Sequence, residues 1–137
     1  MPAKKKKAPP AGLSGVDHVY VAVKDFDAAW AFWTKVVGGS AVTTWGDGDH
    51  KAGIVSLGVG GGIVVAQESE GGGRAELGYQ VVHGRPQLFV KVTAIDKVYK
   101  QMRTRGAKIV SELHKTHWGP RAFSLQGPDG MIVAFIE

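Results

Sequence analysis

The chain contains no cysteine, which excludes disulfide bonds, thiolate metal sites and cysteine nucleophiles. It also contains no apolar run near the roughly 20 residues that a membrane-spanning helix requires. The lysines close to the N-terminus are not followed by an apolar stretch, so we expect no secretory signal peptide. These absences together favour a protein of the cytoplasm that does not enter a membrane.

A strong excess of one charge is missing from most of the chain. The formal net charge is +5, but Lys4 to Lys7 supply four of the 17 basic residues, and the remaining 13 face 12 acidic ones. Residues 1–12 include Pro9 and Pro10 and almost no large apolar side chain, so we expect a disordered, solvated basic tail. Contact of this tail with nucleic acid or another anionic surface is the minor alternative.

An internal repeat organises the rest of the chain. At an offset of 69 residues, segment 18–27 aligns with segment 87–96, Trp30 with Tyr99, and Trp33 with Met102. A module of about 60 residues buries too little surface to be stable alone, so the two copies are expected to pack together. We therefore expect a single domain over residues 13–137, with modules at about 14–69 and 86–137 and a ligand site between or inside them.

Hydrophobic periodicity predicts the order βαβββ in each module, which makes the fold class α+β. In the first module, strands are expected at 18–23, 41–45, 52–57 and 62–67. Its helix follows a cap at Asp25 or Asp27, and its buried stripe comprises Phe26, Ala29, Trp30, Trp33 and Val37. In the second module, strands are expected at 88–92, 109–110, 121–125 and 131–136, with a helix that buries Ile95, Val98, Tyr99 and Met102. Residues 70–85 are the expected link.

A doubled βαβββ pattern that opens with Asp17-His18-Val19 resembles the vicinal oxygen chelate superfamily. Its members include glyoxalase I, bleomycin-resistance proteins, fosfomycin-resistance proteins and extradiol dioxygenases. The segment 118–137, with its Gly127-Pro128-Asp129-Gly130 turn, looks like the closing hairpin of that family. The resemblance covers residues 14–137. It implies paired modules whose strands form a curved mixed sheet around a cavity.

The same resemblance implies a divalent metal held by the first and last strand of each module. The four matching positions are His18, Ala66, Gln87 and Ala134. Alanine has no ligating atom, and one imidazole with one amide is a poor set for a divalent cation. Glu137 and Glu68 are the nearby carboxylates that could substitute for the two alanines. Strand alternation turns Glu137 to the face of the sheet opposite Ala134, and it places Glu68 about 7 Å further along the strand than Ala66. We therefore expect no bound metal.

The cavity face of the sheets, which carries these four positions, is predicted to form an apolar pocket with a few polar groups. Alternation directs inward His18, Tyr20, Ala22, Val64, Ala66, Gln87, Phe89, Lys91, Ile132, Ala134 and Ile136. Trp45 and Trp118 lie near strand ends, where they would stack on a ligand, pack, or contact a second subunit. His18 is interpreted as a hydrogen-bonded pocket residue. Lys91 is interpreted as a side chain at the rim or an anchor for an anionic ligand.

These patterns favour a metal-free protein that binds or sequesters an apolar or aromatic ligand, as bleomycin-resistance-like proteins do with planar drugs. The expected ligand-binding residues are His18, Tyr20, Trp45, Ala66, Gln87, Phe89, Lys91, Trp118 and Ala134. The alternative is a metal-dependent lyase, isomerase or oxygenase of the glyoxalase/dioxygenase type that uses His18 and Gln87 with a displaced carboxylate. No nucleophile elbow marks a Ser-His-Asp triad, so no catalytic residue is predicted. The resemblance also implies a homodimer.

Overall fold

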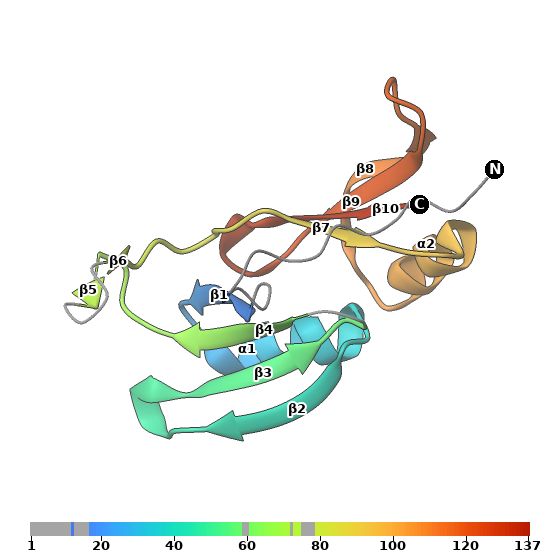
Figure 1. The fold of residues 1–137 in the computed structure, drawn as a ribbon. Coiled ribbons are helices and arrows are strands. Elements are labelled where there is room, and N and C mark those ends of the chain that lie inside the picture. The colour runs from blue at the N-terminus through green and yellow to red at the C-terminus, as the bar shows by residue number, and fades with distance from the viewer. Residues whose placement is uncertain (1–11, 13–16, 59–60, 72, 75–78) are drawn as a thin grey trace.

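A computed structural model of the chain describes residues 12, 17–58, 61–71, 73–74 and 79–137 (Figure 1). The predicted tail lies outside these residues except for Gly12. The first module comprises β1 (His18–Val23), α1 (Phe26–Ala31), a π-helical turn (Phe32–Val36), β2 (Ser40–Trp45), a 3-10 turn (Gly48–His50), β3 (Ala52–Ser56) and β4 (Gly62–Gln67). The link contains β5 (Gly73–Arg74) and β6 (Tyr79–Gln80). The second module comprises β7 (Leu88–Lys91), α2 (Ile95–Thr104), β8 (Lys108–Lys115), β9 (Arg121–Gln126), a 3-10 turn (Pro128–Gly130) and β10 (Ile132–Ile136).

Each module forms a four-stranded mixed sheet with the same topology. The strand orders are β1-β4-β3-β2 and β7-β10-β9-β8, and the first pair of each sheet is parallel while the others are antiparallel. The predicted α+β fold of two βαβββ modules is therefore confirmed. Two details differ. β8 is longer than the two residues expected, and the link carries the short β5–β6 hairpin. Within the described residues, the helices are too short or too polar to cross a bilayer.

The first helix begins where the sequence predicts it. The side chain of Asp25 accepts a hydrogen bond from the Ala28 amide at 3.2 Å, and the side-chain oxygen of Gln67 accepts one from the Phe26 amide at 2.9 Å. Two of the free N–H groups in the first turn are thus satisfied, one of them by the last strand of the module. The helix widens into a π-helical turn before Gly38, whose φ of 86° ends it.

Residues that are equivalent in the repeat meet in one core. Trp33 and Met102 are both almost fully buried, and so are Phe26 and Ile95. The rings of Phe123 and Phe135 in the second sheet stack at a centroid distance of 5.0 Å within the same cluster. Burying each large side chain of this kind contributes about 1.5–3 kcal/mol, so the joint core is a major stabilising contact between the modules.

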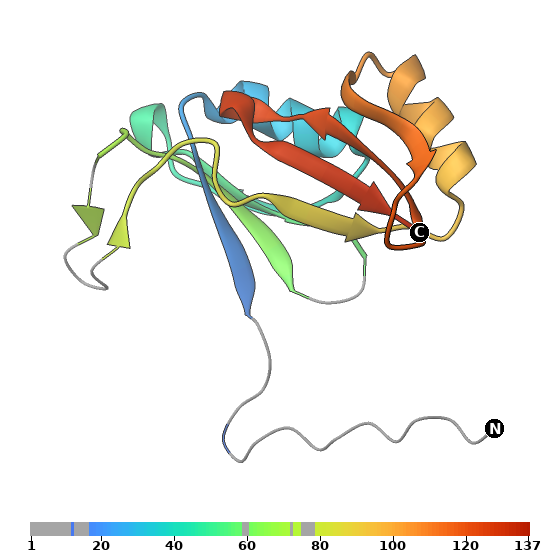
Figure 2. The same cartoon turned by 90° about the horizontal axis from the view of Figure 1, so that it is seen from above.

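Polar contacts also join the two modules. The Lys24 amide at the end of β1 donates to the Asp129 carboxylate at 3.0 Å, in the Pro-Asp-Gly turn between β9 and β10. The guanidinium of Arg105, after α2, donates to the Val36 carbonyl at 3.2 Å. Figure 2 shows that α1 and α2 lie along the same side of the molecule. The helices thereby leave one face of each sheet without a helix.

Candidate functional site

The helix-free face of the first sheet carries a row of small side chains. The register places Trp45 opposite Ala52, Ala52 opposite Ala66, and Ala66 beside Ala22. The neighbours of these alanines along each strand enter the core on the helix side, so alternation puts the row on the other face. The three alanines are only 5–7% exposed, whereas Trp45 is 48% exposed. The row is therefore a floor of methyl groups that ends at an accessible indole.

A polar group lies beside this floor. The Tyr20 hydroxyl donates a hydrogen bond to the Glu68 carboxylate just after β4. The Glu68 carbonyl lies 2.7 Å from Nε2 of His83, and Nδ1 of His83 lies 2.9 Å from the Glu70 carboxylate. Both ring nitrogens of His83 thus face acceptors. These groups border a cavity of about 620 Å³, which is lined by Lys24, Asp49, Gln67, Glu68, Ser69, Glu70 and His83.

The equivalent face of the second sheet is more open. Phe89 is 68% exposed and lies beside Ala134 in the register, and Ala134 lies opposite Ser124. In the next row, Lys91 lies beside Ile136. An aromatic ring and a methyl group therefore stand next to each other on this face, as Trp45 and the alanine floor do on the first sheet.

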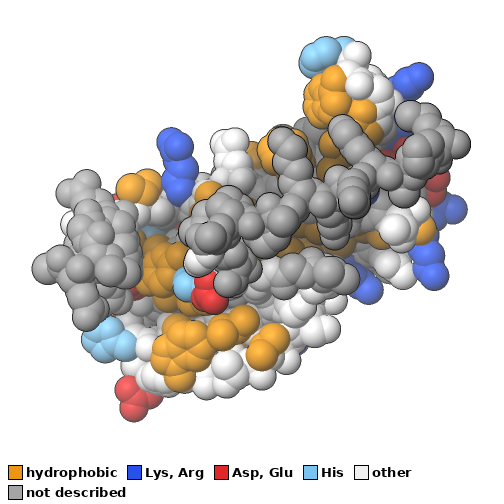
Figure 3. Space-filling model, viewed as in Figure 1, with side chains coloured by type: hydrophobic (Ala, Val, Ile, Leu, Met, Phe, Trp, Pro, Cys, Tyr) orange, Lys and Arg blue, Asp and Glu red, His pale blue; other side chains and the backbone are white. Residues whose placement is uncertain are grey.

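The structure distributes the predicted site residues over these two faces. His18, Tyr20, Trp45 and Ala66 lie on the first sheet; Phe89, Lys91 and Ala134 lie on the second, with Gln87 just before β7. Trp118 is 57% exposed in the loop between β8 and β9, at the end of the molecule away from the β2–β3 turn (Figure 1). Figure 3 shows hydrophobic side chains in separate regions, over β3 and β4 and at the β8–β9 hairpin. The two tryptophans are therefore not brought together within one chain.

Sequence reasoning did not identify Ala52 or the contact of His83 with Glu70. Alanine carries no chemical signal of its own, and its place in the floor follows only from the β3–β4 register. His83 lies in the glycine-rich link, where no periodicity indicates which way a side chain points. Only the way in which the link folds back onto the end of β4 brings the two residues together.

The residues at the family's metal positions do not fit a divalent ion. His18 and Gln87 are exposed, the His18 ring lies 2.7 Å from the Asp17 carboxylate, and Ala66 and Ala134 offer no ligating atom. In the part of the chain that the structure describes, no three His, Asp or Glu side chains are grouped closely enough to hold a metal. Borderline and hard cations require several imidazole or carboxylate ligands, which this set lacks.

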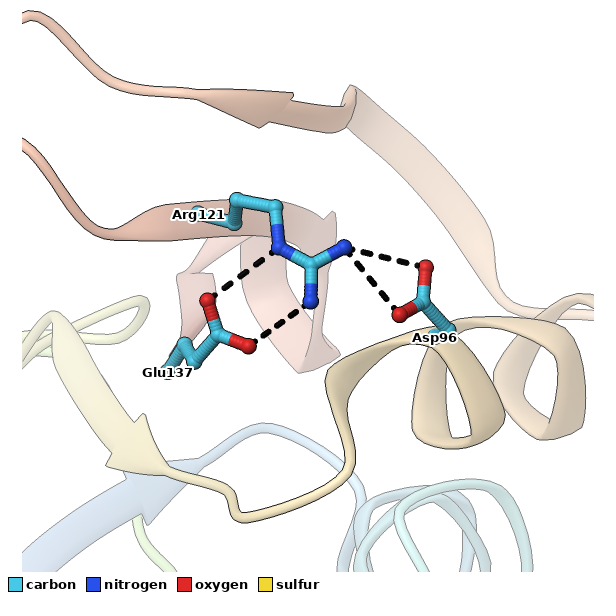
Figure 4. A network of polar contacts seen from close by, with 3 residues as sticks. All are labelled: Asp96, Arg121 and Glu137. Atoms are coloured by element: carbon cyan, nitrogen blue, oxygen red, sulfur yellow. Dashed lines mark hydrogen bonds and ion pairs between the residues drawn. The ribbon is translucent and has the colours of Figure 1, made fainter.

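Glu137 is engaged elsewhere (Figure 4). The guanidinium of Arg121 donates to its two carboxylate oxygens at 3.1 and 2.7 Å, and to the Asp96 carboxylate at 3.1 and 3.2 Å. These hydrogen bonds hold the pKa of the Glu137 carboxyl below its usual value, and the two carboxylates raise the pKa of Arg121. Glu137 therefore fastens the end of β10 to β9 and α2, on the face that alternation predicts.

Comparisons with known proteins agree with this geometry. The model of the glyoxalase/bleomycin resistance protein/dioxygenase superfamily matches residues 15–135. TioX from Micromonospora sp. ML1 superposes with a TM-score of 0.73 and 23% identity, over 90% of this chain and 98% of that one. TnmS3, an antibiotic-binding protein from Streptomyces sp. CB03234, gives a TM-score of 0.73 and 18% identity, over 93% and 98%. A glyoxalase/bleomycin resistance protein/dioxygenase from Alicyclobacillus acidocaldarius gives a TM-score of 0.65 and 17% identity, over 87% of each chain. No curated protein sequence matches the chain.

Proposed function

Because the chain belongs to the glyoxalase/bleomycin resistance protein/dioxygenase superfamily, we propose that it binds an apolar or aromatic small molecule without a metal ion. The observation that carries this proposal is the pairing of alanine with an accessible aromatic ring on both sheets. Ala66 shares a register row with Trp45, and Ala134 lies beside Phe89. The methyl group of Ala134 leaves room for a flat ring beside Phe89, and the exposed rings of Phe89 and Trp45 offer surfaces for stacking.

The similarity to an antibiotic-binding protein supports the same proposal at the level of the fold. The ligand we propose is planar and largely apolar, with some polar groups. Tyr20, whose hydroxyl donates to the Glu68 carboxylate, lies on the strand next to Ala66, and Ser124 lies opposite Ala134. A few oriented polar groups in an apolar site are typical of ligand pockets.

We further propose a homodimer in which the open face around Phe89 is covered by a second copy. Aromatic side chains are enriched at protein–protein interfaces, and Phe89 is 68% exposed in the single chain. Two copies would also supply an aromatic face opposite the one that each chain presents. Light scattering at micromolar concentrations tests this part separately, since a monomeric mass would contradict it.

The binding function is tested by titrating planar aromatic antibiotics while recording tryptophan fluorescence. Saturable quenching that reports Trp45 is expected, because this indole is accessible at the end of the alanine floor. A Trp45→Phe variant should lose most of the signal while keeping affinity within about threefold, since a phenyl ring still stacks. A flat response across a broad panel contradicts the proposal.

The metal-free part has its own experiment. Protein purified without chelator is analysed for divalent metals and then titrated with the same ligands in the presence of EDTA. The expected result is less than stoichiometric metal and unchanged ligand affinity. A tightly held stoichiometric ion, or loss of binding in EDTA, would instead favour the alternative of a metal-dependent enzyme that uses His18 and Gln87.

A further inference from the structure

A second concave site lies between the two modules, away from the alanine floor. This intermodule cleft has a volume of about 230 Å³. It is lined by residues 37–40 and 56–58 of the first module, and by residues 90–92, Val98 and Gln101 of the second. Its base is apolar, because Met102 and Phe135 beneath it belong to the common core. The volume is below that of a drug-sized pocket, so only a small molecule or a short chain fits.

The charged side chains that the described residues bring to the intermodule cleft are basic. Lys91 lines it, and the guanidinium of Arg105 lies against Gly38, where an added Cβ would come within 2.9 Å of Nη1. None of the described residues that line the cleft is acidic, and neither cation forms an ion pair with a described residue. The guanidinium of Arg105 donates one N–H to the Val36 carbonyl, and its other N–H groups can donate to a ligand.

The backbone adds a donor at the same place. β7 is the edge strand of its sheet, and the Val92 amide donates to the Ile136 carbonyl on the inner side at 2.8 Å. Successive amides of a strand point in opposite directions, so the Lys91 amide points to the outer edge. Residues 90–92 line the cleft along this edge. An anion at the edge of β7 would thus meet an N–H group as well as two side-chain cations.

The repeat provides an internal comparison. The equivalent position on the other side of the molecule is a cavity of about 350 Å³, lined by Phe32, residues 106–108 and Asp129 among others. Phe32 stands there in the place that Gln101 takes in the intermodule cleft, 69 residues later. Asp129 supplies a carboxylate that already accepts the Lys24 amide. The architecture is shared, but only the intermodule cleft combines an apolar base with positive charge and no acid among its described lining.

We propose that the intermodule cleft binds a small amphipathic organic anion. Its apolar body lies on Val98 and Met102, and its carboxylate or sulfonate faces Lys91 and Arg105. This site is distinct from the proposed aromatic site. It does not depend on that function, because Trp45, Ala66, Phe89 and Ala134 are not among the residues that line it.

The test titrates the full chain with octanoate, and with octanamide, octylammonium and acetate as matched probes. Backbone and side-chain amide shifts in the NMR spectrum report the position, and calorimetry reports the affinity. Octanoate should shift the Gly38, Gly39 and Gln101 amides saturably. Octanamide should bind at least about fivefold more weakly, since it lacks the charge. Octylammonium and acetate should not saturate, because one has the wrong charge and the other has no apolar body.

Variants separate this site from nonspecific binding. Lys91→Met should weaken octanoate about fivefold and leave octanamide unchanged. Gln101→Phe, which copies the equivalent Phe32, should fill the cleft and abolish both. Lys108→Met, in the equivalent cavity, is the control and should change neither. Equal affinities of octanoate and octanamide, no effect of Lys91→Met, or shifts centred on Phe89 and Ala134 would each overturn the proposal. Because Lys91 is exposed, that variant remains informative even if Gln101→Phe fails to fold.

Discussion

Ala66 and Ala134 both lie on the helix-free face of their sheet, but Ala66 is 7% exposed whereas Ala134 is only half-buried. Each lies on the last strand of its module and beside the parallel first strand. The difference arises from their neighbours. The row neighbours of Ala66, Ala22 and Ala52, are as deeply buried as Ala66 itself, while Ala134 adjoins the protruding Phe89. The two modules thus share a fold and differ in how far their helix-free faces are open.

This difference predicts unequal losses of stability for the same substitution at the two positions. Ala66→Leu should lower the free energy of unfolding by about 1–3 kcal/mol, because the added atoms overpack a closed face. At protein concentrations low enough to keep the chain monomeric, Ala134→Leu should change it by less than about 0.5 kcal/mol, since the open face accommodates a larger side chain. Urea unfolding of both variants gives the comparison. Similar losses at the two positions would show that the second face is covered in solution, as a dimer would cover it.

Phe89 should matter for ligand binding and not for folding. Its ring is largely exposed in the single chain, so Phe89→Ala should leave the unfolding midpoint of the monomer nearly unchanged. Loss of a stacking surface should weaken the binding of a planar aromatic ligand about fivefold to tenfold. Val110→Ala, at another exposed apolar residue of the same sheet, is the matched control and should not affect affinity. A weaker fold with intact affinity would assign Phe89 to packing instead.

Trp33 presents a buried N–H group that the core does not satisfy. The residue is fully buried, and its Nε1 has no hydrogen-bond partner among the residues that the structure describes. Trp33→Ala should cost about 3–5 kcal/mol of unfolding free energy through the cavity that it creates. Trp33→Phe should cost less than half of that, because it keeps an aromatic ring and removes a polar group whose burial costs about 1–3 kcal/mol. Chemical denaturation distinguishes these values, and equal losses would imply that the N–H is satisfied by water.

Most of the fold can be predicted from the sequence, but less of the site can, for physical reasons. β4 spans the predicted residues 62–67, and the Asp25 cap is one of the two residues predicted, because strand alternation and capping are local signals. β8 extends to residue 115 although only 109–110 were expected. Two register irregularities in its pairing with β9 shift the alternation there, so no single period of 2 runs along the strand.

The site depends on register and on how the link folds, which no local pattern encodes. The alignment of Trp45 with Ala52 and Ala66 requires the pairing of three strands, one of which contains a bulge between Ala41 and Thr43. The contact of His83 with Glu70 requires the link to turn back on itself. The lack of metal ligands at Ala66 and Ala134 can be predicted from the sequence alone, because alanine has no ligating atom in any geometry.

The last prediction concerns acid stability and the Arg121–Glu137 pair. Its hydrogen bonds hold the pKa of the Glu137 carboxyl below the usual 4.5, so the folded state disfavours protonation of this group. The stabilisation is therefore complete above pH 4.5 and is lost as the pH falls through the lower folded-state value. Glu137→Gln should lower the melting temperature at pH 7, and its difference from the unmodified chain should shrink below pH 4.5. Glu112→Gln, at an exposed residue without an ion pair to any described residue, should show no such convergence. A difference that stays constant from pH 7 to pH 3 would mean that Glu137 contributes through packing rather than charge.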